Sequence, residues 1–140
     1  MDLLSLASTA DAVLELKDPN SDPPAVLRDE QGAPVAIAFW GLDTAEFRRA
    51  ARAQAERARK RIKSGEEITH EQDVEDGVRW LASVTKGWSA SIALGGAPLP
   101  FSPENAMRLY REVYWVGEQA ADFVRRIGLR QTFSKASAAS

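Results

Sequence analysis

The feature that most constrains the fold is a change of pattern near Asp43. Before it, short apolar runs alternate with turns rich in proline, glycine, asparagine and aspartate. After it, residues 44–63 contain neither glycine nor proline and are rich in alanine and arginine, which is strong helix composition. A small sheet built from such runs needs helices packed on it. The pattern therefore predicts an α+β fold: a small N-terminal antiparallel β-sheet followed by a mainly α-helical region of about four helices.

Three apolar runs are the candidates for strands of this sheet. They cover residues 11–17, 25–28 and 35–40. The connection over residues 18–24 consists almost wholly of turn-forming residues, and Gly32 lies in the second connection. We therefore expect a two- or three-stranded antiparallel sheet in this part of the chain.

The first two helices are marked by capping residues. Asp43 is the expected N-cap of the first helix, with Glu46 completing a capping box, and Ser64-Gly65 its end. Thr69 and Gln72 form a second capping box. The apolar stripe expected on the first helix consists of Phe47, Ala50, Ala51, Ala58 and Ile62.

The later helices are marked in a similar way. Ser102-Pro103 combines an N-cap serine with proline at the first helical position. Tyr114-Trp115 is expected to mark a break between two helices, and Gly128 to end the last one. Residues 88–101 contain Gly95-Gly96 and two prolines, which favours an irregular loop or a small hairpin.

Length and composition indicate one intracellular domain. The 140 residues suit a single domain over residues 1–133, with a β-rich part at 11–40, a helical part at 43–128 and a flexible tail at 134–140. The chain contains no cysteine and carries a net charge of −2, so neither disulfides nor a global attraction to nucleic acid or membrane is expected. Because no run approaches a membrane span and the start lacks a signal-peptide pattern, we expect a soluble cytoplasmic protein.

The sequence offers little for catalysis. The single histidine, His70, lies among acids at the start of a predicted helix and is interpreted as a solvated surface residue. No Ser-His-Asp set is recognisable, and Gly95-Gly96 is not followed by the Lys-Ser/Thr of a phosphate-binding loop. The acids are spread out along the chain, which does not favour a metal site. We expect no catalytic residue, no cofactor and no metal, and a protein that acts by binding other proteins.

Two neighbouring segments carry opposite charge. Residues 44–63 contain eight arginines and lysines against two glutamates, whereas residues 65–79 contain six acids against one arginine. An antiparallel helical hairpin with the charges facing each other accounts for both runs. An acidic protein partner, or nucleic acid bound by the basic run, are the alternatives.

Several segments resemble one protein family in the same order along the chain. Gly87-Trp88-Ser89, followed by Gly96-Ala97-Pro98-Leu99-Pro100-Phe101-Ser102-Pro103-Glu104-Asn105-Ala106, resembles a motif of phage tail assembly chaperones. Tyr114-Trp115-Val116-Gly117-Glu118-Gln119 also resembles the family, and Leu16–Pro19 and Asp43–Arg48 match it more loosely. The chain departs from the pattern at Ala90, where the family has another small residue or glycine, and at Tyr114, where it has proline.

The resemblance implies a function. It implies a non-enzymatic tail assembly chaperone in the cytoplasm of the bacterial host, absent from the mature virion. Its partners would be the tape-measure protein, which it keeps soluble, the tail-tube protein, which it helps to recruit, and, where a frameshift is used, a longer form of itself. The alternatives are a structural head-tail or tail component that stays in the particle, and a small basic-helix nucleic-acid-binding module.

The partner-binding residues expected from the resemblance lie in the matched segments. Trp88 and Phe101 are the candidate anchors, because large aromatic side chains in loops commonly dominate binding. Leu99 and Phe101 alternate with prolines, so the loop is stiff and presents two apolar groups to one side. The same element serves equally as a structural staple that holds the loop to the helix. The predicted site consists of Trp88, Leu99, Phe101, Glu104, Asn105, Trp115 and Gln119.

Overall fold

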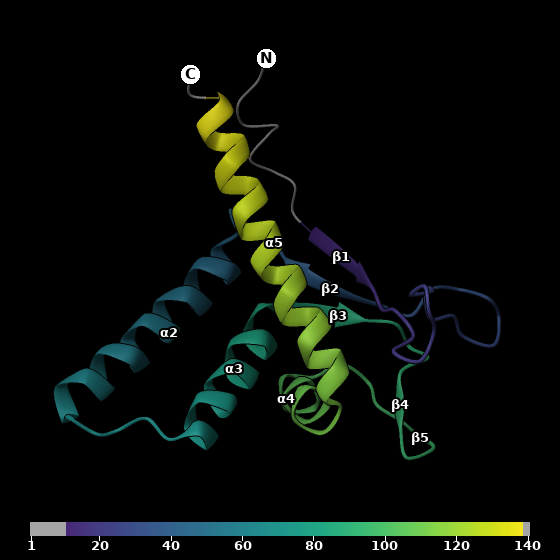
Figure 1. Cartoon of the computed structure of the whole chain (residues 1–140), viewed down its shortest axis with the longest axis horizontal. Helices are drawn as coiled ribbons and strands as arrows, with labels where there is room; N and C mark the ends of the chain where they lie inside the picture. Colours follow the sequence, from purple (N-terminus) through teal and green to yellow (C-terminus); the bar gives the residue numbers. More distant parts are fainter. Residues whose placement is uncertain (1–10, 139–140) are drawn as a thin grey trace.

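The computed structural model describes residues 11–138, with side chains from Ala12 to Ile127. In this part of the chain a small antiparallel sheet is followed by four helices, which confirms the predicted α+β fold (Figure 1). The sheet has the order β1-β2-β3 and consists of β1 (Asp11–Glu15), β2 (Ala36–Trp40) and β3 (Thr85–Trp88). The helices are α2 (Ala45–Ser64), α3 (His70–Val84), α4 (Pro103–Glu112) and α5 (Tyr114–Ala138).

The core lies between the sheet and the helices α3, α4 and α5. Ile37 and Phe39 alternate with less buried residues along β2 and are fully buried, as is Val84 at the end of α3. The ring centroid of Phe39 lies 5.7 Å from that of Phe123, which packs α5 onto the sheet. Helices α2 and α3 run antiparallel and extend to one side of the sheet (Figure 1), and α3 packs more extensively on α4 than on α2.

The third strand of the sheet differs from the sequence prediction. The run at residues 25–28 forms only isolated bridges, Lys17 with Val26 and Arg28 with Pro34. The third strand is instead β3, which pairs antiparallel with β2 and follows α3 without a loop. Thr85 makes this direct change from helix to strand possible, because its backbone is extended while its hydroxyl group donates a hydrogen bond to the carbonyl of Leu81, 2.6 Å away.

The capping residues set the helix boundaries. The N-cap of α2 is Thr44, whose hydroxyl accepts a hydrogen bond from the Phe47 amide at 3.2 Å, so the prediction of Asp43 is wrong by one residue. The capping box of Thr69 and Gln72 on α3 is confirmed. The predicted end of α2 at Ser64-Gly65 is also confirmed, because Gly65 is the C-cap and has the left-handed φ of 68°.

The C-terminal helices begin where the sequence predicts, but the last helix ends later than predicted. The predicted break near Tyr114 is confirmed, because α4 ends at Glu112 and α5 begins at Tyr114, with only Val113 between them. The predicted helix end at Gly128 is wrong, since α5 continues to Ala138. A glycine inside a helix costs only about 1 kcal/mol relative to alanine, and no proline follows to stop the helix. The flexible tail expected for residues 134–140 stays a prediction.

The predicted loop over residues 88–101 contains a small hairpin. It consists of β4 (Ala93–Leu94) and β5 (Ala97–Pro98), joined by Gly95-Gly96. Both glycines have positive φ, 58° and 81°, as a two-residue hairpin turn of this kind requires. The hairpin leads the chain from β3 to the start of α4.

Candidate partner-binding site

Trp88 fastens the loop before α4 to the sheet. Its indole Nε1–H donates a hydrogen bond to the carbonyl oxygen of Leu99, 2.9 Å away. Its ring lies against that of Phe101, with 5.1 Å between centroids and 37° between planes. Leu99 is only 4% exposed, and its amide donates to the carbonyl of Ile92 at 3.0 Å. Three of the predicted site residues therefore meet in one cluster.

Asn105 closes the same cluster from the first turn of α4. Its side-chain Nδ2 donates to the carbonyl of Pro100 at 2.8 Å, and its backbone amide donates to the Ser102 hydroxyl at 3.0 Å. Glu104 lies beside it, exposed, in the first turn, where the helix dipole favours a carboxylate. We call Trp88, Leu99, Phe101 and Asn105 the loop cluster. Its polar groups are used within the fold, so its contacts are those of a staple.

The two predicted residues of α5 lie against other parts of the fold. Gln119 exchanges two hydrogen bonds with the backbone of Lys17, each 2.9 Å long, and so ties α5 to the end of β1. Trp115 is half-buried and lines a groove of about 250 Å³ together with Leu16 and Ile92. Neither residue lines the larger groove that contains Phe101 and is described in the next paragraph. The structure therefore does not gather all seven predicted residues into one site.

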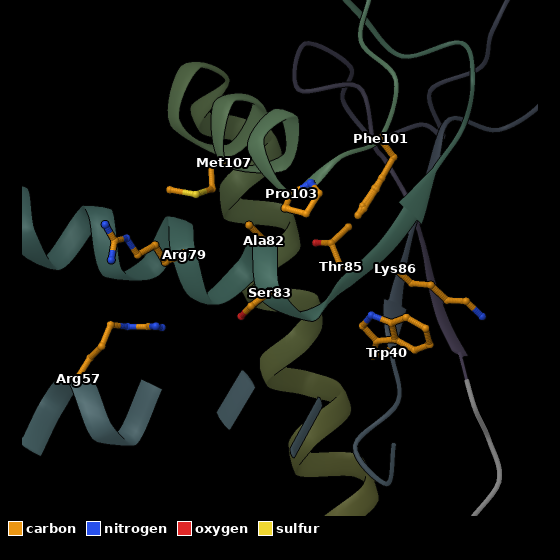
Figure 2. Close-up of a pocket in the computed structure, with 10 residues that line it drawn as sticks. All are labelled: Trp40, Arg57, Arg79, Ala82, Ser83, Thr85, Lys86, Phe101, Pro103 and Met107. Carbon is orange, nitrogen blue, oxygen red and sulfur yellow. The ribbon is translucent and has the colours of Figure 1, made fainter. Parts of the chain in front are cut away.

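A larger groove of about 540 Å³ opens beside the loop cluster (Figure 2). It lies between α2, α3, α4 and the sheet, and Phe101 is the predicted site residue that lines it. In the view of Figure 2 the arginines lie toward one end of the groove, and Phe101, Lys86 and Trp40 toward the other. We call it the basic groove, and its most characteristic lining residues are Trp40, Arg57, Arg79, Lys86, Phe101 and Met107.

The cations of the basic groove are held in different ways. Arg57 donates from Nη2 to Gln54 Oε1 at 2.7 Å, whereas its Nε–H is buried and has no hydrogen-bond partner. Arg79 is exposed and makes no ion pair with a described residue. The ammonium group of Lys86 lies 5.0 Å from the centroid of the Trp40 ring. No carboxylate is among the described side chains that line the groove.

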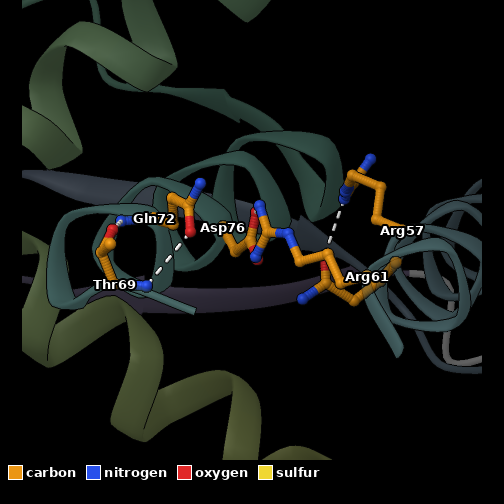
Figure 3. A network of polar contacts seen from close by, with 6 residues as sticks. Arg57, Arg61, Thr69, Gln72 and Asp76 are labelled. Atoms are coloured by element: carbon orange, nitrogen blue, oxygen red, sulfur yellow. Dashed lines mark hydrogen bonds and ion pairs between the residues drawn. The ribbon is translucent and has the colours of Figure 1, made fainter. Parts of the chain in front are cut away.

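Facing charges join α2 and α3 at a single ion pair. Arg61 forms two hydrogen bonds with the carboxylate of Asp76, one of them 2.8 Å long from Nη2 (Figure 3). Among the described residues, no other base of α2 pairs with an acid of α3. The predicted charge hairpin is therefore limited to this pair, and most of the basic face of α2 points to solvent.

Another acid of α3 pairs with α4 instead. Glu75 accepts hydrogen bonds from Arg111, the shorter one 2.6 Å long. These bonds hold the pKa of the Glu75 carboxyl below its usual value, and the charges of Arg111 and Arg79 act in the same direction. Deeper in this interface, burial raises the pKa of Tyr110, whose hydroxyl lies 2.7 Å from that of Thr85. The ion pair joins α4 to α3, and the hydroxyl pair joins α4 to the start of β3, directly after α3.

The far end of the α2–α3 pair exposes apolar side chains. Ile62 is 79% exposed, Ile68 55% and Val74 49%. They come from the last turns of α2, the connecting loop and the start of α3. The apolar stripe predicted on α2 is thus only partly packed: Phe47 and Ala50 contact the rest of the fold, and the remainder is exposed. We call Ile62, Ile68 and Val74 the apolar tip.

The described residues offer no grouping for metal chemistry. No cluster of three or more histidine, cysteine, aspartate or glutamate side chains that could hold a metal ion occurs among them. His70 is exposed at the first position of α3. Over the same described range, none of the helices is both long enough and apolar enough to span a membrane.

Comparison of the chain with protein-family models, curated proteins and solved structures finds no match. The functional argument therefore rests on the sequence resemblance and on the surfaces described above. Of those surfaces, the basic groove was not predicted. Its lining residues are far apart in the sequence, and the only signal for it was the basic run of α2.

Proposed function

We propose that the chain is a non-enzymatic phage tail assembly chaperone. It binds the tape-measure protein in the host cytoplasm, keeps that protein soluble and helps to recruit tail-tube subunits. One observation carries the proposal: the segments at Gly87-Trp88 and Leu99–Asn105, which resemble the family motif, meet in the loop cluster and are joined by the hydrogen bond between Trp88 and Leu99. They act as one unit, as residues of one shared motif would.

The surface supports this proposal through its apolar features. The apolar tip and the basic groove both present apolar side chains to solvent on the α2–α3 side of the molecule. Amphipathic helices commonly dock on such grooves. The resemblance implies a partner that is long and helical, so this mode of recognition fits it.

Co-purification tests the proposal directly. The chain is co-expressed with a tagged tape-measure protein from the same phage, and the complex is washed at high salt and analysed by size exclusion. We expect the two proteins to elute together, because apolar contacts survive salt that screens surface charges. Elution of the chain only as a free protein would contradict the proposal. Mass spectrometry of purified virions separates this function from a structural one, since a chaperone is absent from the finished particle.

A further inference from the structure

The basic groove combines Arg57 and Arg79 with apolar side chains, and no carboxylate is among its described lining residues. We propose that it binds an amphipathic helix of a partner protein that carries carboxylates beside its apolar face. That this partner is the tape-measure protein rests on the proposed function. That the partner segment is acidic and apolar follows from the groove residues alone.

The two arginines of the groove favour a partner segment that carries a carboxylate. Arg57 projects from α2 and Arg79 from α3 toward one end of the groove (Figure 2). The buried Nε–H of Arg57 lacks an acceptor, and a buried donor without an acceptor is costly. A carboxylate from outside would accept from Arg57 and also lie near Arg79, and bonds between two charged groups are stronger than neutral ones.

The other lining residues select an apolar neighbour for that acid. Met107 and Phe101 are half-buried and line the groove together with Trp40. Methionine adapts its shape to different occupants, and aromatic rings provide large contact areas. A volume of about 540 Å³ holds several side chains from one face of a helix. The occupant must therefore present acidic and apolar side chains on adjacent turns.

Nucleic acid fits the same groove less well. Base stacking needs free aromatic faces, and one face of Phe101 is already in contact with Trp88 and one face of Trp40 with Lys86. The chain as a whole is also acidic, with a net charge of −2. These contacts favour a protein segment as the occupant, and duplex DNA is included in the test as the competing ligand.

Fluorescence anisotropy with designed peptides tests the proposal. The probes are labelled amphipathic peptides of about 18 residues, long enough to form a helix, with leucine on one face and glutamate beside it. Matched peptides carry glutamine or lysine in place of glutamate, and a labelled DNA duplex is the fourth probe. We expect saturable binding of the glutamate peptide, about tenfold weaker binding of the glutamine peptide, and none of the lysine peptide.

Matched variants locate the binding. Arg57→Gln combined with Arg79→Gln should weaken binding of the glutamate peptide by about tenfold or more. The control combines Arg52→Gln with Arg59→Gln, which removes the same charge from the opposite face of α2 and should leave binding within about twofold. Circular dichroism and thermal melting confirm that both variants fold.

Three results would overturn the proposal: no saturable binding of the glutamate peptide, equal losses in the two double variants, or tighter binding of DNA than of the peptide. The peptides contain no tape-measure sequence. If the peptides fail to bind but the chain co-purifies with the tape-measure protein, the groove is not the binding site and the proposed function stands. If the peptides bind but co-purification fails, the groove proposal stands and the proposed function is contradicted.

Discussion

At the scale of single residues, a few polar side chains bond to backbone groups outside their own helix or strand and so join elements to loops. Trp88, Asn105 and Gln119 each donate a hydrogen bond to a main-chain carbonyl outside their own element: that of Leu99, Pro100 and Lys17, respectively. Such bonds fix loops that have little regular structure of their own. We therefore expect substitution of these residues to lower the stability of the fold.

At Trp88, the contribution of the hydrogen bond to stability can be separated from that of the ring contact. Trp88→Phe keeps a ring against Phe101 but removes the bond to the Leu99 carbonyl, and should lower the free energy of unfolding by about 1 kcal/mol. Trp88→Ala also removes the ring and should lower it by about 3 kcal/mol. Urea denaturation followed by circular dichroism measures both, with the exposed Val13→Ala as the control. Equal stability of Trp88→Ala and the wild type would show that the loop cluster holds nothing together.

At the scale of elements, α2 is held mainly at its beginning. Phe47 packs edge-on against Trp80 with 5.4 Å between ring centroids, and Ala50 is buried. Farther along, Arg61 and Asp76 join the two helices, and Ile62 is exposed. The outer half of α2 therefore depends on few contacts with the rest of the fold.

The contribution of the Arg61–Asp76 ion pair to stability can be measured by comparing two substitutions on α2. Arg61→Gln leaves the partly buried Asp76 without its charged partner and should lower the free energy of unfolding by about 1 kcal/mol. Arg59→Gln removes the same charge from an exposed position of the same helix and should change it by less than about 0.5 kcal/mol. Chemical denaturation at low salt measures the difference. Equal effects of the two substitutions would mean that the pair contributes nothing specific.

The contact between α3 and α4 should depend on pH through Glu75. Because Arg111 lowers the pKa of this carboxyl in the folded state, its stabilisation is fully present above the ordinary glutamate pKa. It is lost as the pH falls through the lower pKa of the folded protein. We expect Glu75→Gln to be less stable than the wild type at neutral pH, and the difference to shrink as the pH falls below the ordinary glutamate pKa and as the salt concentration rises. A difference that stays constant over this range would contradict the assignment.

At the scale of the whole molecule, local signals predicted the elements better than their partners. Capping residues such as Thr69 and Ser102 act within one turn, so the sequence shows where α3 and α4 begin. The strand β3 was missed because its partner β2 lies far away in the sequence and no turn separates β3 from α3. The helix end at Gly128 was misplaced because a glycine alone does not stop a helix.

The same limit applies to the site. The segment Leu99–Asn105 is recognisable as a unit because its residues are adjacent, and the structure joins it to Trp88. The basic groove combines residues from β2, α2, α3, β3 and α4, and no local pattern brings Arg57 together with Phe101. The splitting of the acids of α3 between Arg61 and Arg111 likewise depends on how α4 packs.

The central claim is that this chain keeps a tape-measure protein soluble, and the soluble fraction of that protein measures it most directly. The tape-measure protein of the same phage is expressed alone, with the wild-type chain, and with a folded control protein of similar size. The account predicts that it remains in the supernatant after centrifugation only when the chain is present. Equal insolubility in all three cases would contradict the account.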